Sequence, residues 1–386
     1  MFFKDLSTAP ADPVFGQFQI FQADPRTDKI DLMVGIYRDE QLKERLLPVV
    51  AEVKKLLLPE DQKADYLPID GLKALSSRIG ELLFGPLWGG NHIYGAHTTG
   101  GAAALRIGSE LLSRHLTKKL YLPNQSWPGH SVILSQGGCE LANYSYFSVD
   151  TGTFDLAAMV DSLGVIPPGS AVLLHASCHN PTGCDPSLEE WKTISHEMKK
   201  RHLFPFFDCA YQGFGSGLNQ DAEAIRLFVE DGHELFVAYS CSKNFGLYRQ
   251  RVGAFFVVCG SAEVQTRVGS QVKRIARGLY SNPPSHGACI VAHILEDPSL
   301  KGRWEKEVHG MNRRIHMMRA ALADQLHMPS IVQGKGMFCL MNLSKAAVQQ
   351  LRDQFGIYLL DTGRLNLAGL TEENLTKVSH GLLTVL

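Results

Sequence analysis

A lysine stands between two apolar runs near the middle of the chain, where its amine could do chemistry. Lys243 follows LFVAY (Leu235–Tyr239) and precedes VGAFFVVC (Val252–Cys259). Both runs are rich in Val, Phe and Leu, as buried strands are. A lysine at such a junction ordinarily solvates a turn. A desolvated amine, however, can act as a base or a nucleophile, so its neighbours decide which interpretation holds.

Three other chemically capable side chains follow the ends of predicted strands. LFPFFD ends at Asp208, and Tyr211 comes three residues later. Asn180 follows the run AVLLHA (Ala171–Ala176). In an open α/β sheet, ligands bind beyond the carboxyl ends of the strands. We therefore expect an acid, a phenol, an amide and the lysine to meet at one edge of a sheet.

A glycine pair supplies a candidate anion site. In TTGGAAALRIGSELLSR (Thr98–Arg114), Gly100 and Gly101 precede a helix-like stretch. Backbone N–H groups at glycines can approach a ligand closely, and a helix N-terminus favours an anion. Ser240 and Arg251, on either side of the lysine, could bind the same phosphate. The alternative is an ordinary turn, since neither GxGxxG nor GxxxxGK[ST] is present.

A phosphate site, a lysine and an acid together indicate pyridoxal phosphate as the cofactor. Pyridoxal phosphate binds a lysine amine covalently, and a charged partner tunes its ring nitrogen. We expect Asp208 to keep that nitrogen protonated. The stretch SWPGH adds Trp127 as a stacking face and His130 behind the acid. Taken alone, Trp127 also suits an ordinary core position.

The elements that must position these residues alternate between strand and helix from about residue 100 to 260. The predicted strands are KLYLP (Lys119–Pro123), SVILS (Ser131–Ser135), AVLLHA, LFPFFD and LFVAYS (Leu235–Ser240). Their nearly continuous apolar character is typical of parallel strands that are buried on both faces. This alternation predicts an α/β domain with a mostly parallel sheet.

Helices are expected between and after these strands. One should begin after Asp185, with Asp185 as its cap, Pro186 in its first position and an apolar face through Trp191 and Ile194. Residues 219–230, 262–276 and 303–326 are also expected to be helical. The C-terminal segments 337–343, 345–355 and 363–369 predict a smaller α+β unit.

Bulk composition limits the classes of protein that this chain can be. Its 386 residues suggest two domains, and 45% hydrophobic residues can fill large cores. A net charge of −1 gives no electrostatic reason to expect nucleic acid or an anionic membrane as a partner. No apolar run approaches the roughly 20 residues of a membrane helix, and the N-terminus lacks a signal-like apolar stretch. Eight scattered cysteines favour a reducing compartment, so we expect a cytoplasmic protein.

Several motifs resemble those of one enzyme family. They are YLPIDGL, NQSWPGH, HASCHNPTG, FFDCAYQGFGSGL, SCSKNFGLYRQRVGAFF, YSNPPSHGA and GRLNLAGL. In this order they resemble the class I pyridoxal-phosphate aminotransferases, in the branch that acts on aspartate and aromatic amino acids. The resemblance runs from VGIYRDE (Val34–Glu40) to the last residues. It implies a fold type I architecture, with a seven-stranded, mostly parallel sheet in the large domain.

The resemblance implies catalytic roles for the residues at the sheet edge. Lys243 matches the lysine that binds the cofactor and then moves the substrate's α-proton. Asp208 matches the partner of the ring nitrogen, with His130 behind it. Tyr211 and Asn180 match the pair that binds the cofactor's phenolic oxygen.

The resemblance also implies a set of cofactor contacts around the ring and the phosphate. Trp127 matches the stacking residue. The phosphate site matches Gly101, Ala102, Ser240 and Arg251, with Tyr66 reaching it from the other subunit. Relatives usually carry threonine where this chain has Ala102, so one phosphate hydrogen bond is lost. We therefore expect weaker retention of the cofactor than in relatives with threonine.

Two arginines match the residues that bind the substrate's carboxylates. Arg364 resembles the one that grips the α-carboxylate in a bidentate pair, where Asn180 and Trp127 also make contact. Arg277 resembles the one that the partner subunit contributes to a side-chain carboxylate. Gly35 matches a glycine whose backbone covers the substrate. Without the motifs, both arginines would be taken as ordinary surface charges.

The resemblance implies transfer of an amino group between aspartate and 2-oxoglutarate in a homodimer with shared sites. Residues 1–12 would form an N-terminal arm, 13–43 with 311–386 a small domain and 44–310 the large domain. Amino acids and 2-oxo acids are the expected small-molecule partners. An aromatic amino-acid aminotransferase stays open as an alternative, because the same arginine can swing aside.

Three further alternatives need separate features. Another pyridoxal-phosphate reaction, such as decarboxylation or β-elimination, would need Lys243 and Asp208 but not both arginines. A regulatory module on this fold would normally add a DNA-binding segment, which we do not find. A metal enzyme would have to use the His and Cys side chains of HASCHNPTGC (175–184), whose spacing lacks a paired CxxC. We therefore expect no metal.

Overall fold

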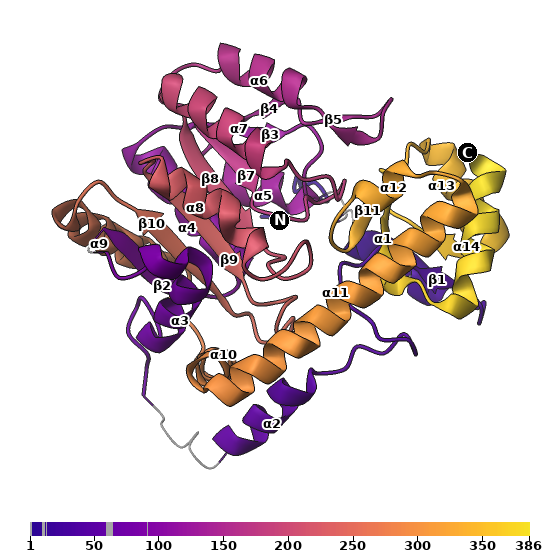
Figure 1. Cartoon of the computed structure of the whole chain (residues 1–386), viewed down its shortest axis with the longest axis horizontal. Coiled ribbons are helices and arrows are strands. Elements are labelled where there is room, and N and C mark those ends of the chain that lie inside the picture. The colour runs from indigo at the N-terminus through magenta and orange to yellow at the C-terminus, as the bar shows by residue number, and fades with distance from the viewer. Residues whose placement is uncertain (1, 10–11, 13, 59–64, 91) are drawn as a thin grey trace.

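A twisted seven-stranded sheet organises most of the chain (Figure 1). The structure is a computed structural model that describes residues 2–9, 12, 14–58, 65–90 and 92–386. The strand order is β2-β10-β9-β8-β7-β3-β4. The strands are β2 (Ile93–Thr98), β3 (Lys119–Pro123), β4 (Glu140–Tyr144), β7 (Ala171–His175), β8 (Phe204–Cys209), β9 (Leu235–Ser240) and β10 (Gly253–Val258).

The sheet is mixed, with a single reversed strand. Neighbours from β4 to β9 pair in parallel, whereas β10 is antiparallel to both β9 and β2. Because β10 is reversed between them, β2 and β9 point the same way. Six carboxyl ends therefore share one edge, which confirms the predicted α/β class with a mostly parallel sheet.

Alternate side chains of the central strands enter two separate cores. On one face, Phe206, Phe236 and Phe255 pack among residues of α4 (Gly101–His115) and α9 (Ala262–Leu279). On the other face, the next residue along each strand joins the larger core. Since successive side chains of a strand point to opposite faces, nearly continuous apolar runs are needed to cover both.

The remaining helices around the sheet complete these layers. They are α2 (Pro48–Leu57), α3 (Lys73–Phe84), α5 (Pro128–Gln136), α6 (Leu156–Val165), α7 (Leu188–Lys200), α8 (Glu223–Glu230), α10 (His286–Glu296) and the 29-residue α11 (Pro298–Leu326). Short 3₁₀ turns cover Gly85–Leu87 and Gln220–Ala222, and a small hairpin joins β5 (Phe147–Ser148) to β6 (Thr153–Phe154). Among the described residues, no helix combines the length and apolarity required to span a membrane.

A second group of elements lies beside the sheet, at the far end of α11 (Figure 1). It contains α1 (Phe15–Ala23), β1 (Ile30–Asp31), α12 (Ser330–Gln333), β11 (Phe338–Leu340), α13 (Lys345–Gln350), a π-helical turn (Leu351–Phe355), β12 (Ile357–Tyr358), β13 (Arg364–Asn366), a 3₁₀ turn (Leu367–Gly369) and α14 (Glu372–Val385). The early strand β1 pairs with β12, and β11 pairs with β13. These pairings bring the segment after residue 31 next to the C-terminal part of the chain.

Two sequence-based predictions are wrong. The predicted strand Ser131–Ser135 lies inside helix α5, and the strand that follows is β4. The run was too short to separate a strand from a buried helix, and β4 lies at the sheet edge, with only Tyr144 of its residues buried. Asp185 does not cap α7, because Ser187 does so in a capping box with Glu190.

Most other elements agree with the predictions. The expected strands at 119–123, 171–176, 203–208 and 235–240 match β3, β7, β8 and β9, and the expected helices match α8, α9 and α11. The C-terminal segments form β11, α13 with its π-helical turn, and β13. The domain boundaries stay a prediction, and residues 1, 10 and 11 of the predicted N-terminal arm lie outside the described residues.

Candidate active site

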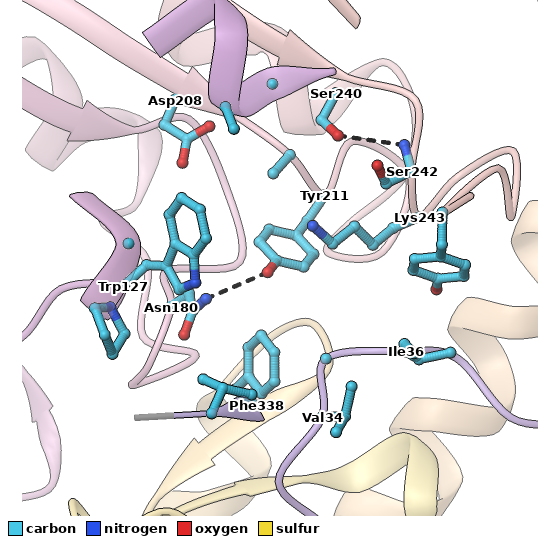
Figure 2. Close-up of a pocket in the computed structure, with 18 of the residues that line it drawn as sticks. Val34, Ile36, Trp127, Asn180, Asp208, Tyr211, Ser240, Ser242, Lys243 and Phe338 are labelled. Carbon is cyan, nitrogen blue, oxygen red and sulfur yellow. Dashed lines mark hydrogen bonds between the residues drawn. The ribbon is translucent and has the colours of Figure 1, made fainter. Parts of the chain in front are cut away.

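Most of the predicted residues line a cavity of about 570 Å³ at the carboxyl edge of the sheet (Figure 2). The sheet side contributes side chains from the ends of β8 and β9, and the second group of elements closes the opposite side. Its lining includes Val34, Gly35, Ile36, Gly101, Ala102, Leu105, Trp127, Asn180, Asp208, Tyr211, Ser240, Ser242, Lys243, Tyr248, Arg251, Phe338 and Arg364.

Strand register assembles the predicted phosphate site. Ser240 at the end of β9 is paired with Gly253 of β10, and Gly253 is paired with Thr98 of β2. Arg251 precedes this row, and Gly101 opens helix α4 just after it. The end of β9 and the start of β10 therefore meet the distant segment 98–101 at one point of the sheet edge.

Glycine is needed where these segments touch. Gly100 has φ = 82°, a left-handed value that disfavours other residues, and a Cβ there would lie 2.7 Å from Arg251 Nη2. A Cβ on Gly101 would lie 2.9 Å from Ser240 Cβ. Because Gly100 and Gly101 carry no side chains, the α4 N-terminus, the Ser240 hydroxyl and the Arg251 guanidinium can lie close together. We call this site the cup.

Asp208 presents a carboxylate to the same cavity. Its side chain is 12% exposed, and His130 Nε2 lies 3.0 Å from Asp208 Oδ2. Ser126 Oγ in turn lies 2.8 Å from His130 Nδ1. Burial by itself would raise the pKa of Asp208, but the hydrogen bond with His130 and nearby positive charge outweigh it and lower that pKa. The carboxylate therefore stays ionised at neutral pH.

Lys243 extends from the end of β9 into the cavity, toward Tyr211 (Figure 2). Its Nζ lies 4.8 Å from the centre of the Tyr211 ring. Burial lowers the pKa of Lys243 to about 8, and the charge of Asp208 opposes that shift. A fraction of the amine is consequently neutral near physiological pH, as a base or nucleophile requires.

A chain of hydrogen bonds crosses the cavity wall. Asn180 Nδ2 donates to Tyr211 Oη at 3.3 Å, and Arg364 Nη1 donates to Asn180 Oδ1 at 3.0 Å. Arg364 Nη2 also donates to the carbonyl of Met33 at 2.6 Å. Burial lowers the pKa of Arg364 to about 10 and raises that of Tyr211. The guanidinium is 2% exposed and its Nε has no hydrogen-bond partner among the described residues.

Aromatic rings and one glycine form the rest of the wall. Trp127 meets His130 edge to face, with ring centroids 5.2 Å apart. The Phe338 ring lies 4.2 Å from the Arg364 guanidinium carbon. Gly35 faces that ring, since a Cβ there would come within 2.9 Å of Phe338 Cζ. Trp127, Gly35 and Arg364 all line the same cavity.

Two predicted residues do not reach this cavity within one chain. Tyr66 is 90% exposed, and Arg277 is exposed on α9 with its Nη1 bonded to Ser281 Oγ at 2.5 Å. Neither residue lines the cavity. The prediction that they serve a neighbouring subunit is not tested by a single chain.

Sequence reasoning missed several residues of the wall. Phe338, Ser242, Tyr248, Val34 and Ile36 all line the cavity. Ser242 and Tyr248 belong to the SCSKNFGLYRQRVGAFF stretch, and Val34 and Ile36 flank Gly35, so the motifs contained a signal. The fold of the C-terminal segment brings Phe338 to the cavity, and no local sequence pattern around Phe338 indicates this position.

The His and Cys side chains considered for a metal do not form a ligand set. His175 and His179 pack against each other with ring centroids 4.3 Å apart, and burial lowers the pKa of both. The Cys178 thiol approaches the Tyr211 carbonyl. Among the described residues, no three His, Cys, Asp or Glu side chains are grouped to hold a metal ion.

Known proteins resemble this chain over its whole length. The family described as "Aminotransferase class I and II" matches residues 27–382. The aspartate aminotransferase of Escherichia coli K12 is 39% identical over 395 residues, covering 100% of both chains. The aromatic-amino-acid aminotransferase of Pseudomonas aeruginosa is 38% identical, covering 99% of this chain and 98% of the relative. The crystal structure of an aromatic-amino-acid aminotransferase from Burkholderia pseudomallei, covalently bound to pyridoxal phosphate, superposes with a TM-score of 0.96 at 38% identity, covering 100% of both chains.

Proposed function

Because this chain belongs to the class I and II aminotransferases, we propose that it transfers an amino group between aspartate and 2-oxoglutarate with pyridoxal phosphate as its cofactor. The observation that carries the proposal is the convergence of a partly neutral amine, an ionised carboxylate and an anion cup in one cavity. Lys243, Asp208 and the Gly101–Ser240–Arg251 cup are the residues concerned.

The residues present fit this cofactor. Gly101, Ser240 and Arg251 all line the cavity, and the close contact of Gly101 with Ser240 brings the α4 N-terminus and a hydroxyl together where a phosphate would bind. Asp208 keeps part of its carboxylate open to the cavity, while the buried His130 holds it from behind. The amine of Lys243 would hold the cofactor, and the Trp127 ring would cover its face.

When bound, pyridoxal phosphate supplies an electron-withdrawing ring that stabilises negative charge at the substrate's α-carbon. Asp208 would hold a proton at the ring nitrogen, because its carboxylate stays ionised and accepts a hydrogen bond there. Tyr211 and Asn180 would donate hydrogen bonds to the cofactor's phenolic oxygen. Their mutual 3.3 Å bond fixes both groups on the same wall.

Lys243 would move the proton. Its Nζ has a pKa of about 8, so a useful fraction is neutral and can accept a proton from the substrate's α-carbon. The 4.8 Å contact with the Tyr211 ring keeps the protonated amine near the reacting atoms. Lys243 Nζ would then donate the proton to the cofactor.

Arg364 would bind and orient the substrate's α-carboxylate. Its buried guanidinium has an unpartnered Nε and no carboxylate within ion-pair distance among the described residues. A buried charge without a counterion is costly, so a substrate carboxylate would be bound strongly there. Asn180 would hold the guanidinium in place through its 3.0 Å bond.

We also propose a homodimer in which Tyr66 and Arg277 complete the partner's site. Both side chains are exposed in the single chain, although the resemblance assigns them to the phosphate and to the substrate's second carboxylate. Arg277 would then select dicarboxylic substrates. The small domain would comprise residues 13–43 and 311–386, which α11 connects to the large domain, 44–310, through one continuous helix.

Aromatic amino acids are a second candidate substrate class. Val34, Ile36, Leu105 and Phe338 give the cavity an apolar wall that suits an aromatic ring. Relatives with the aromatic name share as much sequence as several with the aspartate name. A cytoplasmic location is proposed as well, because cysteines such as Cys209 and Cys339 are buried and not arranged as a disulfide scaffold.

Spectroscopy of the purified protein tests the proposal. A visible cofactor band should shift on adding aspartate and return on adding 2-oxoglutarate. Because the amino acid and the 2-oxo acid use the same cavity one after the other, initial rates should give parallel double-reciprocal lines. Intersecting lines would contradict the ping-pong mechanism. A band that aspartate leaves unchanged while phenylalanine shifts it would contradict the assignment to aspartate.

A further inference from the structure

Two aspartates stand behind the active-site loops and hold them by their backbones. Asp185 accepts hydrogen bonds from the backbone N–H groups of Cys178 (2.7 Å) and His179 (2.8 Å), directly before Asn180. Asp221 accepts three, from residues 213, 215 and 216, shortly after Tyr211. We call Asp185 and Asp221 the carboxylate pair. Each member fixes one of the two loops whose side chains meet in the Asn180–Tyr211 bond.

The carboxylate pair lines a second, small cavity of about 150 Å³. Asp221 is 4% exposed, and Asp185 is partly buried. The hydroxyl of Ser177 lines the same cavity, is buried and has no hydrogen-bond partner among the described residues. Two carboxylates share this confined space and require a compensating positive charge.

One lysine supplies positive charge to that cavity. Lys335 lies in the short loop between α12 and β11 and lines the cavity together with the carboxylate pair. Its backbone is fixed on both sides: its N–H donates to the Gly183 carbonyl at 2.6 Å, and its carbonyl accepts from Arg319 Nη2 at 3.1 Å. Gly336, with φ = 71°, lies so close to Cys178 that a Cβ would come within 2.5 Å of Cys178 Cβ. The loop is therefore docked on the loop that carries Asn180.

We propose that Lys335 is a positioning residue for substrate binding: its ammonium compensates the carboxylate pair and so keeps Asn180 and Tyr211 in register with Arg364. The Lys335 loop leads directly into β11, which carries Phe338 into the substrate cavity. One cation thus links three parts of the cavity wall, namely the Asn180 loop, the Tyr211 loop and β11. The effect on substrate binding rests on the proposed function, whereas the charge compensation does not.

The electrostatic effects agree with this role. Burial raises the pKa of Asp185 to about 6 and also raises that of Asp221, and the charge of Lys335 acts to lower both. The other charged or titratable groups that face the pair are Cys178, Cys184, Cys209, Tyr146 and Arg319, and Glu223 lines the same cavity. Of these groups, Arg319 is the other cation, and four backbone carbonyls already occupy its guanidinium.

The sign of the pH effect follows from these raised values. A carboxyl whose pKa is higher in the folded than in the unfolded state stabilises the fold at low pH, and that stability is lost as the pH rises through the folded-state value. Lys335 reduces this loss because it lowers the folded-state pKa of both aspartates. Removing its charge should therefore destabilise the protein near pH 8 and have little effect near pH 5.

The first test measures thermal unfolding of the holoenzyme at pH 5 and pH 8. For Lys335→Met we expect a Tm about 3 °C below wild type at pH 8 and within about 1 °C of it at pH 5. Lys335→Arg should behave as wild type, and so should Lys306→Met, which removes an exposed lysine from α11. An equal loss at both pH values, or none, would overturn the charge compensation. If Lys335→Met does not fold, Lys335→Gln takes its place in the same comparison.

The second test separates substrate binding from chemistry at pH 8. Lys335→Met should raise the KM for aspartate about three- to tenfold, with a smaller change in kcat, and Lys335→Arg should restore the wild-type value. An unchanged KM alongside the pH-dependent Tm loss would overturn the positioning role and leave the charge compensation supported. Absence of aminotransferase activity in the wild type would contradict the proposed function instead, and the Tm comparison would still decide the role of the carboxylate pair.

Discussion

The two halves of the active-site cavity are built in different ways. In the half that suits the cofactor, Lys243, Asp208 and the cup at Gly101 converge within one chain through the register of a single sheet, and the exposed Tyr66 is the contact proposed to come from a partner. The half that would receive the substrate's side chain lacks its predicted arginine within one chain, because Arg277 lies exposed outside the cavity. In the proposed homodimer, the fold of one subunit would specify the chemistry, whereas substrate selection would depend on assembly.

This difference has a physical origin. Neighbouring strands hold the cofactor-side residues in paired positions, such as Ser240 opposite Gly253, so their geometry is set by backbone hydrogen bonds. Arg277 stands on the exposed face of α9, where the neighbours of its side chain are solvent and Ser281. Variants on the two sides should therefore fail in different ways, and the predictions below follow that division.

Removing the amine of Lys243 should have the largest effect. Lys243→Ala should lower kcat by at least about 10⁴-fold, because the group that holds the cofactor and moves the proton is lost. The coupled rate of oxaloacetate formation from aspartate and 2-oxoglutarate measures it. Lys192→Ala, at an exposed lysine on α7, is the matched control and should be fully active. A Lys243→Ala enzyme within tenfold of wild type would contradict the role of the amine.

Removing the guanidinium of Arg277 should affect one class of substrate. Arg277→Ala should lower kcat/KM for aspartate by about 10²–10³-fold, the effect of leaving a carboxylate without its charged partner. The value for phenylalanine should change much less. Arg267→Ala, at an exposed arginine of the same helix, should change neither. Equal losses for both substrates would place Arg277 outside the substrate site.

Mixed dimers sharpen the comparison between the two halves. Lys243→Ala and Arg277→Ala subunits are each defective alone, but a hybrid dimer should contain one site with both residues intact. Co-refolding or subunit exchange should therefore restore up to about half of the wild-type rate per hybrid dimer, because about one active site in two is intact. No gain on mixing would show that the two residues do not serve sites shared between subunits.

The hydroxyl missing from the phosphate cup should have a smaller effect. Ala102→Thr should tighten the dissociation constant for pyridoxal phosphate about tenfold or more, because one hydrogen bond to a charged acceptor is worth about 1.5–3 kcal/mol. Ala102→Val has the same shape without the hydroxyl and should not tighten binding. Fluorescence titration of the apoprotein measures all three. A wild type that binds more tightly than Ala102→Thr would contradict this account of the cup.

The pH dependence of kcat should report the amine directly. Lys243 must be neutral to accept a proton, and its pKa is about 8, so kcat should fall about tenfold per unit as the pH drops below that value. Above pH 8 the rate should level off. A profile that is flat between pH 6 and pH 8 would mean that a different group, or a step other than proton transfer, limits the reaction.

Much of the cofactor half was predictable from the sequence. Continuous apolar runs are typical of buried parallel strands, and ligands bind at the carboxyl ends of such strands. The sequence therefore placed Asp208 and Lys243 at one edge of the sheet. The glycine pair before α4 indicated a close approach of the backbone to a ligand. Only the resemblance of motifs identified Arg364 as a site residue. Arg364 is 184 positions from its hydrogen-bond partner Asn180, and no local sequence pattern around it indicates that contact.

The failures also have physical causes. Asp185 is of a residue type that often caps helices, but Ser187 caps α7 instead. Asp185 accepts hydrogen bonds from two backbone N–H groups of the active-site loop. Strand β4 escaped prediction because an edge strand lacks the buried pattern of its neighbours. The position of Lys335 beside Asp185 and Asp221 depends on packing between segments more than a hundred residues apart, which no single-sequence pattern encodes.

The central claim is that Lys243 holds pyridoxal phosphate in this cavity. Borohydride reduction of the purified holoprotein, followed by proteolysis and mass spectrometry of the peptides, tests it most directly. A phosphopyridoxyl adduct is expected on the peptide that contains Lys243, and none on that peptide in Lys243→Ala. An adduct on a different lysine, or no adduct after incubation with excess cofactor, would contradict it.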